Sequence, residues 1–452
     1  MKNPMSFITI PKRGASHRAS LAFVVLTALA LGISFSSAIF AETNTGTATD
    51  PAVAATDPGM RIYRDLELIR EPGALPPLMA LNTPTPEPIE APSLEEIDAS
   101  IQRGVDFLMT HQEPKGAWGS PRNTKALNIT APVPGAHQAF QTGSTSLALS
   151  ALLEIEALGW DDERITPAID RAEEWMLSAL PTLRRGSQDT IYNNWGHAYA
   201  IQALARMLER KPDDAERCEI IRDMIAMQVD KLVRYECIDG GWAYYDFDYH
   251  TRQPGPSTIS FVTATVLVAL REAEDAGVEV PERIVNRGME SILRQRKPDY
   301  TYLYGEYLQT MPMRGINRPS GSLGRSQACN IAMRHWGDQT VTDEMLTAWL
   351  DRLFARNGWL SMGRKRPVPH ESWDQVAGYF YYYGHYYAAL CIEALPEDQQ
   401  GPYQDFMART LMDLQETNGC WWDYPLYDYH EAYGTGFALQ SLVRSRRVED
   451  SE

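Results

Sequence analysis

The chain has 452 residues, 44% of them hydrophobic, and a formal net charge of −17 at pH 7. This composition fits a large globular protein and argues against a nucleic-acid partner, because phosphate binding needs concentrated positive charge. The five cysteines are too few and too scattered for a disulfide framework. One bridge, between Cys218 and Cys237, is a possibility, and burial as free thiols is the alternative.

The first 41 residues predict an export signal. Basic residues precede an apolar stretch over residues 21–41, which ends in small residues suited to cleavage. We therefore expect an exported protein, periplasmic or extracellular. An uncleaved signal that anchors the chain is the alternative, since about 20 apolar residues can span a bilayer, and it is the one membrane contact that we expect.

Residues 42–92 are rich in Pro, Thr and Ala and predict an extended linker. Residues 447–452 form a short, acidic tail. The folded domain is expected between them, over residues 93–446.

Helical patterns run through this domain in pairs. The pairs are 94–111 with 142–158, 165–180 with 195–208, 214–235 with 259–276, 282–296 with 323–336, 342–356 with 379–395, and 404–415 with 433–444. The first helix of a pair is amphipathic and the second is nearly apolar all round, so the second helices should be enclosed by the first. This arrangement predicts an all-α fold, an (α/α)6 toroid of six helical hairpins, whose closed ring leaves no end repeat uncovered.

A short motif separates the two helices in several of these pairs. Gln-x-x-x-Gly-x-Trp spans Gln112–Trp118 and Gln415–Trp421, and a reduced form, Gly240-Gly241-Trp242, follows the fifth helix. This motif and the hairpin period resemble the terpenoid cyclase and protein prenyltransferase superfamily over residues 93–446. The chain is most similar in character to exported bacterial proteins with a prenyltransferase/squalene-oxidase repeat.

The catalytic motifs of that superfamily are largely missing. Squalene-hopene-type cyclases carry Asp-x-Asp-Asp at the start of one inner helix, where this chain has Ile259-Ser-Phe-Val262. Protonation of an alkene needs a strong carboxylic acid, so the proton-driven cyclase mechanism is disfavoured.

Zinc is the other ligand that the resemblance suggests. In the prenyltransferases, Asp-x-Cys and a His hold zinc. His385 is similar to that His, but Gly324-Arg325-Ser326 replaces Asp-x-Cys. We expect no metal or cofactor, and zinc bound by His370, His385 and a carboxylate is the alternative.

Histidines supply the candidate catalytic groups. His137, His197, His250, His370, His385 and His430 all fall just before, or in the first turn of, a predicted inner helix. In a toroid these positions would gather at one rim of the ring, although polar residues are also ordinary at helix starts.

Acidic residues accompany several of these histidines. Asp248-Tyr-His250 and Asp428-Tyr-His430 are the same tripeptide after the same motif, and each is a candidate for a carboxylate-oriented imidazole. His370, Glu371 and Asp374, with His385, form a second candidate acid–base group.

Tyrosine, tryptophan and arginine supply the candidate ligand-binding groups. The candidates are Tyr245, Tyr381, Tyr383, Trp422, Tyr427, Arg318 and Arg325. Tyrosine has an apolar ring and a polar tip, so a cavity lined in this way suits an amphipathic ligand. Arginine is suited to a carboxylate or diphosphate.

Together these features predict an exported toroid protein that binds or transforms a small amphipathic ligand, of isoprenoid or lipid class, in a Tyr- and His-lined central cavity. A periplasmic glycan lyase or hydrolase, with an oligosaccharide as its ligand, is the first alternative. A non-catalytic binding or scaffold protein is the second. A deep apolar tunnel would favour the isoprenoid, an open groove the glycan, and a filled centre the scaffold.

Overall fold

The computed structural model describes residues 83–125, 137–185 and 193–447. The predicted signal peptide lies outside the described residues, as do residues 42–82 of the predicted linker and 448–452 of the predicted tail. Residues 83–92 form no helix or strand. None of the helices in the described ranges is long and apolar enough to cross a lipid bilayer.

The described residues fold into helices joined by loops, without a β-strand, which confirms the all-α prediction. The α-helices are α4 (Leu94–His111), α5 (His137–Ala157), α6 (Ile165–Ala179), α7 (Asn193–Arg210), α8 (Ala215–Arg234), α9 (Ser260–Asp275), α10 (Glu282–Gln295), α11 (Leu323–His335), α12 (Asp343–Ala355), α13 (Asn357–Ser361), α14 (Tyr381–Glu393), α15 (Glu397–Met412) and α16 (His430–Arg444). The 3-10 helices are η1 (Leu180–Thr182), η2 (Glu306–Leu308), η3 (Gly315–Asn317), η4 (Ser320–Ser322), η5 (Trp373–Gln375) and η6 (Gly378–Phe380).

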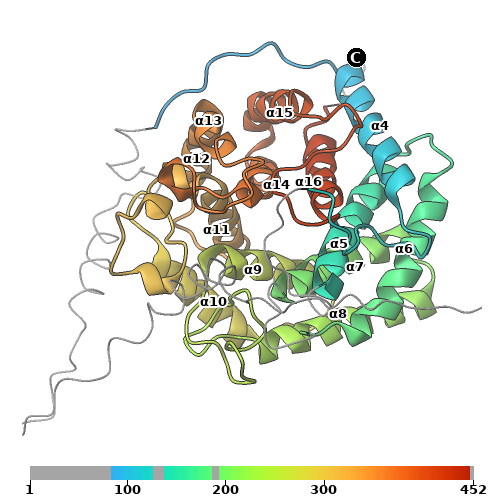
Figure 1. Ribbon diagram of the computed structural model, residues 1–452, viewed down its shortest axis with the longest axis horizontal. Coiled ribbons are helices and arrows are strands. Elements are labelled where there is room, and N and C mark those ends of the chain that lie inside the picture. The colour runs from blue at the N-terminus through green and yellow to red at the C-terminus, as the bar shows by residue number, and fades with distance from the viewer. Residues whose placement is uncertain (1–82, 126–136, 186–192, 448–452) are drawn as a thin grey trace, which may run out of the picture. The chain divides into compact units, whose positions relative to one another are not determined.

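An inner ring consists of α5, α7, α9, α11, α14 and α16. Each of these helices packs against the next, and α16 packs back on α5, which closes the ring (Figure 1). Enclosure explains their apolar character: every residue of α9 from Ser260 to Leu270 is buried. The toroid that the sequence predicts is therefore the observed fold.

The remaining long helices lie outside this ring (Figure 1). Helix α10 is typical, since it buries Ile284, Val285 and Ile292 while Arg283 stays exposed. Helices α6, α8, α10 and α12 each pack mainly on the inner helix that precedes them in the chain, and α4 packs on α16. The sequence pairs each outer helix with the inner helix that follows it. In the structure, most outer helices pack mainly on the inner helix that precedes them.

The Gln-x-x-x-Gly-x-Trp motif is a turn that fastens one outer helix to the next. Gln112 donates through Nε2 to the carbonyls of Gly116, at 3.0 Å, and of Ala168 on α6, at 2.8 Å. Gly116 has a φ of 97° and lies against the backbone of Arg171, also on α6. The positive φ and the close approach both require glycine.

The tryptophan of the motif joins the turn to both helices of its hairpin. The Trp118 indole donates to the Leu108 carbonyl in the last turn of α4 at 2.8 Å, and its backbone N–H donates to Thr145 on α5. Trp242 and Trp421 make the corresponding bonds to Leu232 and Leu411, each at 2.8 Å. Each indole is fully buried, so its N–H needs this partner.

A fourth copy of this turn follows α10, where the sequence analysis did not identify one. Arg296, Tyr300 and Tyr302 take the places of Gln, Gly and Trp, and Lys297 N–H donates to the Thr301 carbonyl as Glu113 N–H donates to that of Ala117. Tyr300 adopts a φ of 56°, which is rare for a residue other than glycine. This turn therefore shares its backbone hydrogen bond with the turn at Gly116, although the side chains of the two turns differ.

A largely half-buried ion network joins the inner helices at their C-terminal ends. Glu154 of α5 accepts from Arg206 of α7 at 2.6 Å and from Arg444 of α16 at 2.5 Å. Arg206 also pairs with Glu272 of α9, and Arg444 with Glu393 of α14. The network links five of the inner helices and places positive charge near helix C-termini, where it is favourable.

Two details of the sequence analysis need correction. All five cysteines are buried and free, so the possible Cys218–Cys237 bridge is not formed and the alternative of buried thiols is confirmed. Helix α15 begins at Glu397, although the sequence predicts a start at residue 404, because Pro402 lies inside the helix rather than before it.

The turn at Gly419 gives a test of ring closure. Gly419 has a φ of 87°, and a Cβ there would collide with the Arg103 carbonyl oxygen on α4. Gly159 has a φ of 73° with open space around it. We expect Gly159→Ala to lower the free energy of unfolding by about 1–2 kcal/mol through its backbone alone, and Gly419→Ala to lower it by at least about 2 kcal/mol more. Urea unfolding followed by tryptophan fluorescence measures both, and equal losses would show that the contact with α4 contributes nothing.

Candidate functional site

The N-termini of the inner helices share one rim of the ring. Near these ends, Tyr383 of α14 donates to the Phe261 carbonyl of α9 at 2.9 Å, and its ring centroid lies 6.3 Å from that of Phe437 on α16. The C-terminal ends meet instead in the ion network, so the inner helices run parallel. The loops and turns that precede these helices therefore surround the N-terminal rim.

Aromatic side chains pack the axis of the ring below this rim. Tyr199 of α7 and Tyr386 of α14 place their ring centroids 5.6 and 5.0 Å from that of Phe437, and Tyr383 lies 4.7 Å from Tyr387. All of these side chains are at most 1% exposed. They form an aromatic floor that fills the central cavity predicted from the sequence, and a filled centre is the feature expected of the scaffold alternative. A ligand would therefore have to meet the protein at the rim.

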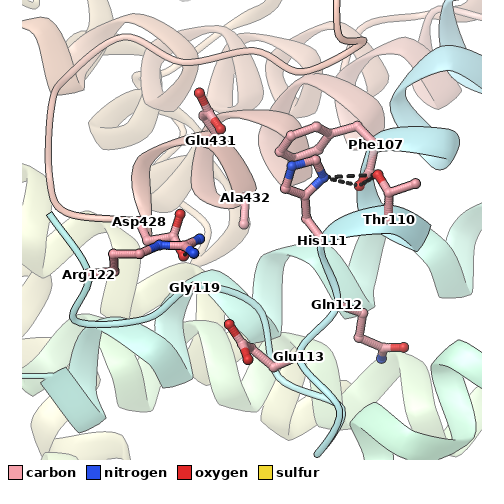
Figure 2. Close-up of a pocket in the computed structure, with 10 residues that line it drawn as sticks. All are labelled: Phe107, Thr110, His111, Gln112, Glu113, Gly119, Arg122, Asp428, Glu431 and Ala432. Atoms are coloured by element: carbon pink, nitrogen blue, oxygen red, sulfur yellow. Dashed lines mark hydrogen bonds and ion pairs between the residues drawn. The ribbon is translucent and has the colours of Figure 1, made fainter. Parts of the chain in front are cut away.

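A cavity of about 160 Å³, the seam pocket, opens at the rim where the last hairpin meets the first. Figure 2 shows its lining, which combines the C-terminal turn of α4, the turn that follows it and the start of α16. The lining residues are Phe107, Thr110, His111, Gln112, Glu113, Gly119, Arg122, Asp428, Glu431 and Ala432. Three carboxylates and one guanidinium make it a polar cavity.

The polar groups of the seam pocket are held by local contacts. Asp428 accepts from the Ser120 hydroxyl at 2.7 Å and from Arg122 at 3.1 Å. Glu431 pairs with Lys125 at 3.2 Å, and the nearby His430 and Lys125 lower the pKa of its carboxyl to about 2. His111 stacks on Phe107 with ring centroids 4.0 Å apart. The pocket thus offers carboxylates beside a flat ring surface.

A chain of hydroxyl groups lies elsewhere on the rim. The Tyr244 and Tyr304 hydroxyls share a hydrogen bond, the Tyr304 and Tyr379 hydroxyls lie 3.4 Å apart, and Tyr379 lies 3.2 Å from Nε2 of His370. Nδ1 of His370 lies 2.8 Å from the Gln375 carbonyl, which can only accept. The neutral imidazole therefore carries its proton on Nδ1 and accepts the Tyr379 proton at Nε2. Burial lowers the pKa of His370, in accord with the neutral form.

Arg325 lies beneath this tyrosine–histidine chain. It is fully buried, and its guanidinium carbon is 5.8 Å from the centre of the Tyr304 ring. Its hydrogen bonds go to the carbonyls of Tyr302, Gly321 and Ile316. Within the described residues no carboxylate pairs with it, and burial lowers its pKa to about 10. Arg325 was predicted to bind a ligand, but most of its N–H groups are committed to backbone carbonyls, with its charge held next to the Tyr304 ring.

His385 and His197 do not lie at the rim, which corrects their prediction as catalytic residues. His385 is fully buried between α14 and α13, where Nε2 accepts from the Asn357 amide at 2.8 Å and Nδ1 donates to the Tyr381 carbonyl at 2.7 Å. His197, also fully buried, bonds Gln228 of α8 at 2.7 Å. Burial lowers the pKa values to about 4 and about 3, so both are neutral packing residues.

The predicted Asp–His pairs are not formed as expected. Asp428 binds Ser120 and Arg122, whereas Nε2 of His430 lies 3.7 Å from the Glu431 carboxylate and makes no hydrogen bond to Asp428. His430 instead packs edge-on against Trp422, with ring centroids 5.2 Å apart. Asp248 accepts from the Tyr249 backbone N–H, and the exposed His250 packs on the Tyr249 ring. The repeated tripeptide is therefore a repeated loop rather than a repeated acid–base pair.

The acidic residues near His370 also have other roles. Glu371 is exposed, and Asp374 accepts from Ser320 and lies 3.7 Å from Arg318, so it fastens one loop to another. No three possible metal ligands meet anywhere in the described residues. The alternative of zinc shared by His370 and His385 lacks support, because each imidazole is bonded to different neighbours.

The predicted aromatic ligand-binding residues are divided between rim and core. Tyr381 and Tyr383 are buried, whereas Tyr245, Trp422 and Tyr427 are half-buried in the rim loops. The Trp422 ring has both Lys125 and Lys365 ammonium groups at 4.6 Å from its centre. Tyr427 packs edge-on against His137, 5.0 Å away.

Four rim residues follow a positional rule. Ser120, Tyr244, Tyr304 and Asp423 each stand two residues after the aromatic residue of a turn, and each takes part in a rim contact. Asp423 accepts from the Tyr382 N–H at the start of α14, at 3.0 Å. Alignment of the four turns, including the one at Tyr302, would have identified this position.

Solved structures similar to this chain include several toroid enzymes. A type II terpene cyclase from Scytonema shares 13% identity over 78% of this chain and 99% of that one, with a TM-score of 0.45. A cellobiose 2-epimerase from Spirochaeta thermophila shares 16% over 78% and 96%, with a TM-score of 0.49. An unsaturated glucuronyl hydrolase from Streptococcus agalactiae shares 13% over 82% and 95%, with a TM-score of 0.44.

These likenesses assign no reaction to this chain, since all three TM-scores lie below 0.5. No protein-family model and no curated protein sequence matches the chain. A terpenoid cyclase is nevertheless among the structures that the chain resembles, as the sequence predicts.

Asp423 should make the free energy of unfolding depend on pH. Burial raises the pKa of its carboxyl from 3.8 to about 7, although the Tyr382 N–H opposes the shift. Between pH 3.8 and about 7, the folded state keeps a proton on Asp423 that the unfolded state releases. The contribution of this carboxyl to the free energy of unfolding is therefore complete at acid pH and is lost as the pH rises toward 7. We expect the loss to be on the order of 4 kcal/mol in unfolding free energy. The Asp423→Asn variant should show a smaller decline between pH 4 and 8 in urea unfolding, and parallel profiles would contradict the shift.

Proposed function

We propose that this protein binds a small amphipathic ligand, of isoprenoid or lipid class, at the N-terminal rim of its helical ring. The observation that supports this most is the tyrosine–histidine chain of Tyr244, Tyr304, Tyr379 and His370, which lies above the charge of Arg325 and beside the aromatic floor. Hydroxyl groups would bind the polar end of such a ligand, and the ring faces its apolar part.

The direction of the hydrogen bonds in the tyrosine–histidine chain bears on its chemistry. Because His370 accepts the proton of Tyr379, the Tyr379 oxygen is left to accept from Tyr304. The chain is therefore polarised toward His370, which is the acceptor of any proton that enters from the ligand side. The neutral imidazole and the adjacent phenols are suited to binding and proton transfer, without an Asp-x-Asp-Asp acid.

A glycan ligand is the second candidate, and a different place on the rim favours it. The seam pocket presents Asp428, Glu431 and Glu113 with Arg122, next to the stacked rings of Phe107 and His111. Carboxylates and a flat ring surface are typical of sites that bind hydroxyl-rich sugars. Such a protein would act as a periplasmic lyase or hydrolase, if the expected export takes place.

Ligand capture with variants of each place distinguishes the two. We expect wild-type protein, incubated with a lipid and oligosaccharide extract of its native envelope, to retain an amphipathic lipid detectable by mass spectrometry. Tyr304→Phe and His370→Gln each remove one link of the chain and should reduce retention about tenfold. Asp428→Asn in the seam pocket is the matched control and should retain the lipid.

The opposite results have distinct meanings. An oligosaccharide that is retained by wild type and lost in Asp428→Asn would contradict the lipid proposal and support the seam pocket. Retention of no ligand by wild type would overturn both, in favour of a scaffold.

A further inference from the structure

Two loops on the rim carry an unusual share of the exposed apolar side chains. Six of the twelve large hydrophobic residues exposed in the described chain lie in residues 306–318 and 362–375. They are Tyr307, Met311, Met313, Met362, Val368 and Trp373, called here the rim patch. Met313 is 67% exposed and Trp373 is 64% exposed. Solvent exposure of so many such residues in one place marks a contact surface.

The two loops form one unit. Arg314 donates through Nε to the Gln375 side-chain oxygen at 3.0 Å, and η3 packs on η5. Ser320 donates to the Asp374 carboxylate, which also lies near Arg318. Met313 and Trp373 thus each stand next to a residue that joins the two loops. The two loops that carry the rim patch are therefore held together, although they are far apart in sequence.

The backbone around Trp373 is held in costly conformations. His370, Asp374 and Gln375 have φ values of 63°, 54° and 56°, in a region that residues other than glycine rarely occupy. This strain holds an indole in solvent, where it gains no packing energy within the chain. The strained residues also have partners within the fold, since His370 bonds the Gln375 carbonyl and Asp374 accepts from Ser320.

Positive charge accompanies the rim patch. Arg314 and Arg366 are exposed, and within the described residues neither pairs with a carboxylate; their Nε groups bond a side-chain amide and the Met362 carbonyl. Glu371 is an exposed carboxylate on the same loop. The whole chain carries a charge of −17, so two unpaired arginines beside exposed Trp and Met residues are a local departure from its general charge.

We propose that the rim patch docks on the surface of an anionic phospholipid bilayer. Trp and Tyr rings prefer the interfacial depth of a membrane, Met side chains can enter the acyl region, and arginines bind lipid phosphates. Charges elsewhere on the protein are screened beyond about 8–10 Å at physiological salt, so the local arginines determine the attraction. This proposal does not depend on the nature of the rim ligand, and it would place the tyrosine–histidine chain next to the lipid.

Vesicle sedimentation of the full chain tests this proposal. We expect wild type to bind vesicles of phosphatidylglycerol and phosphatidylcholine in equal parts, and to bind pure phosphatidylcholine vesicles more weakly. The double variant Met313→Ser with Trp373→Ser should reduce binding to both compositions on the order of tenfold. Arg314→Gln with Arg366→Gln should reduce binding to the anionic vesicles alone and remove the difference between them.

Matched controls on the outer helix α8 keep this test specific. Ile220 is 48% exposed. Arg222 is also exposed, and its Nε donates to a backbone carbonyl, as the Nε of Arg366 does. Ile220→Ser and Arg222→Gln should leave binding unchanged. Any contribution of the N-terminal apolar residues would be the same in every variant. The proposal would be overturned if wild type bound neither kind of vesicle. It would also be overturned if the rim variants and the α8 variants lost vesicle binding equally. Unchanged binding in both rim variants would do the same.

Discussion

Closure of the ring depends on one turn, repeated with different side chains. The turn after α15 reaches across to α4, where Gln415 donates to the Ser100 carbonyl at 2.9 Å. The turn after α4 makes the same bond to Ala168 on α6. Because these two turns make the same bond, the last hairpin meets the first in the same way that the first meets the second. A glycine with positive φ lets the two backbones approach, and a buried indole fills the space behind it.

The two ends of the ring differ in how they are held. The C-terminal ends of five inner helices are joined by the Glu154, Arg206 and Arg444 network, whose charges are satisfied by one another. Loss of one member would remove a partner from half-buried charges on neighbouring helices, which would weaken that end of the ring. The aromatic floor occupies the axis. The N-terminal rim, in contrast, is built from loops of different lengths, which can vary without disturbing the helices.

The helices could be predicted from the sequence, whereas most rim contacts could not. Apolar periodicity placed α4, α10 and α11 to within a residue or two, because burial determines where such patterns begin and end. His385 was misplaced because the pattern shows that a position is near a helix start but not which face it occupies; its imidazole points between α14 and α13. Asp428 was paired with the wrong partner, since Ser120 is remote in sequence and becomes a neighbour only through ring closure. Contacts of this kind depend on register between hairpins, which no local pattern contains.

The turn that departs most from the motif is also the one closest to the proposed site. In the turns at Gly116 and Gly419, glycine and tryptophan serve packing alone. In the turn after α10, Tyr300 replaces the glycine in spite of its φ of 56°, and Tyr302 replaces the tryptophan and bonds Asn330. Two residues later, Tyr304 enters the hydroxyl chain with Tyr244 and Tyr379. Arg325 is bonded to the carbonyl of the same Tyr302, so its charge beneath Tyr304 is held in place by the altered turn. The motif thus gives up its usual side chains, and accepts a positive φ at Tyr300, in the turn that leads into the hydroxyl chain, whereas it keeps glycine and tryptophan at ring closure.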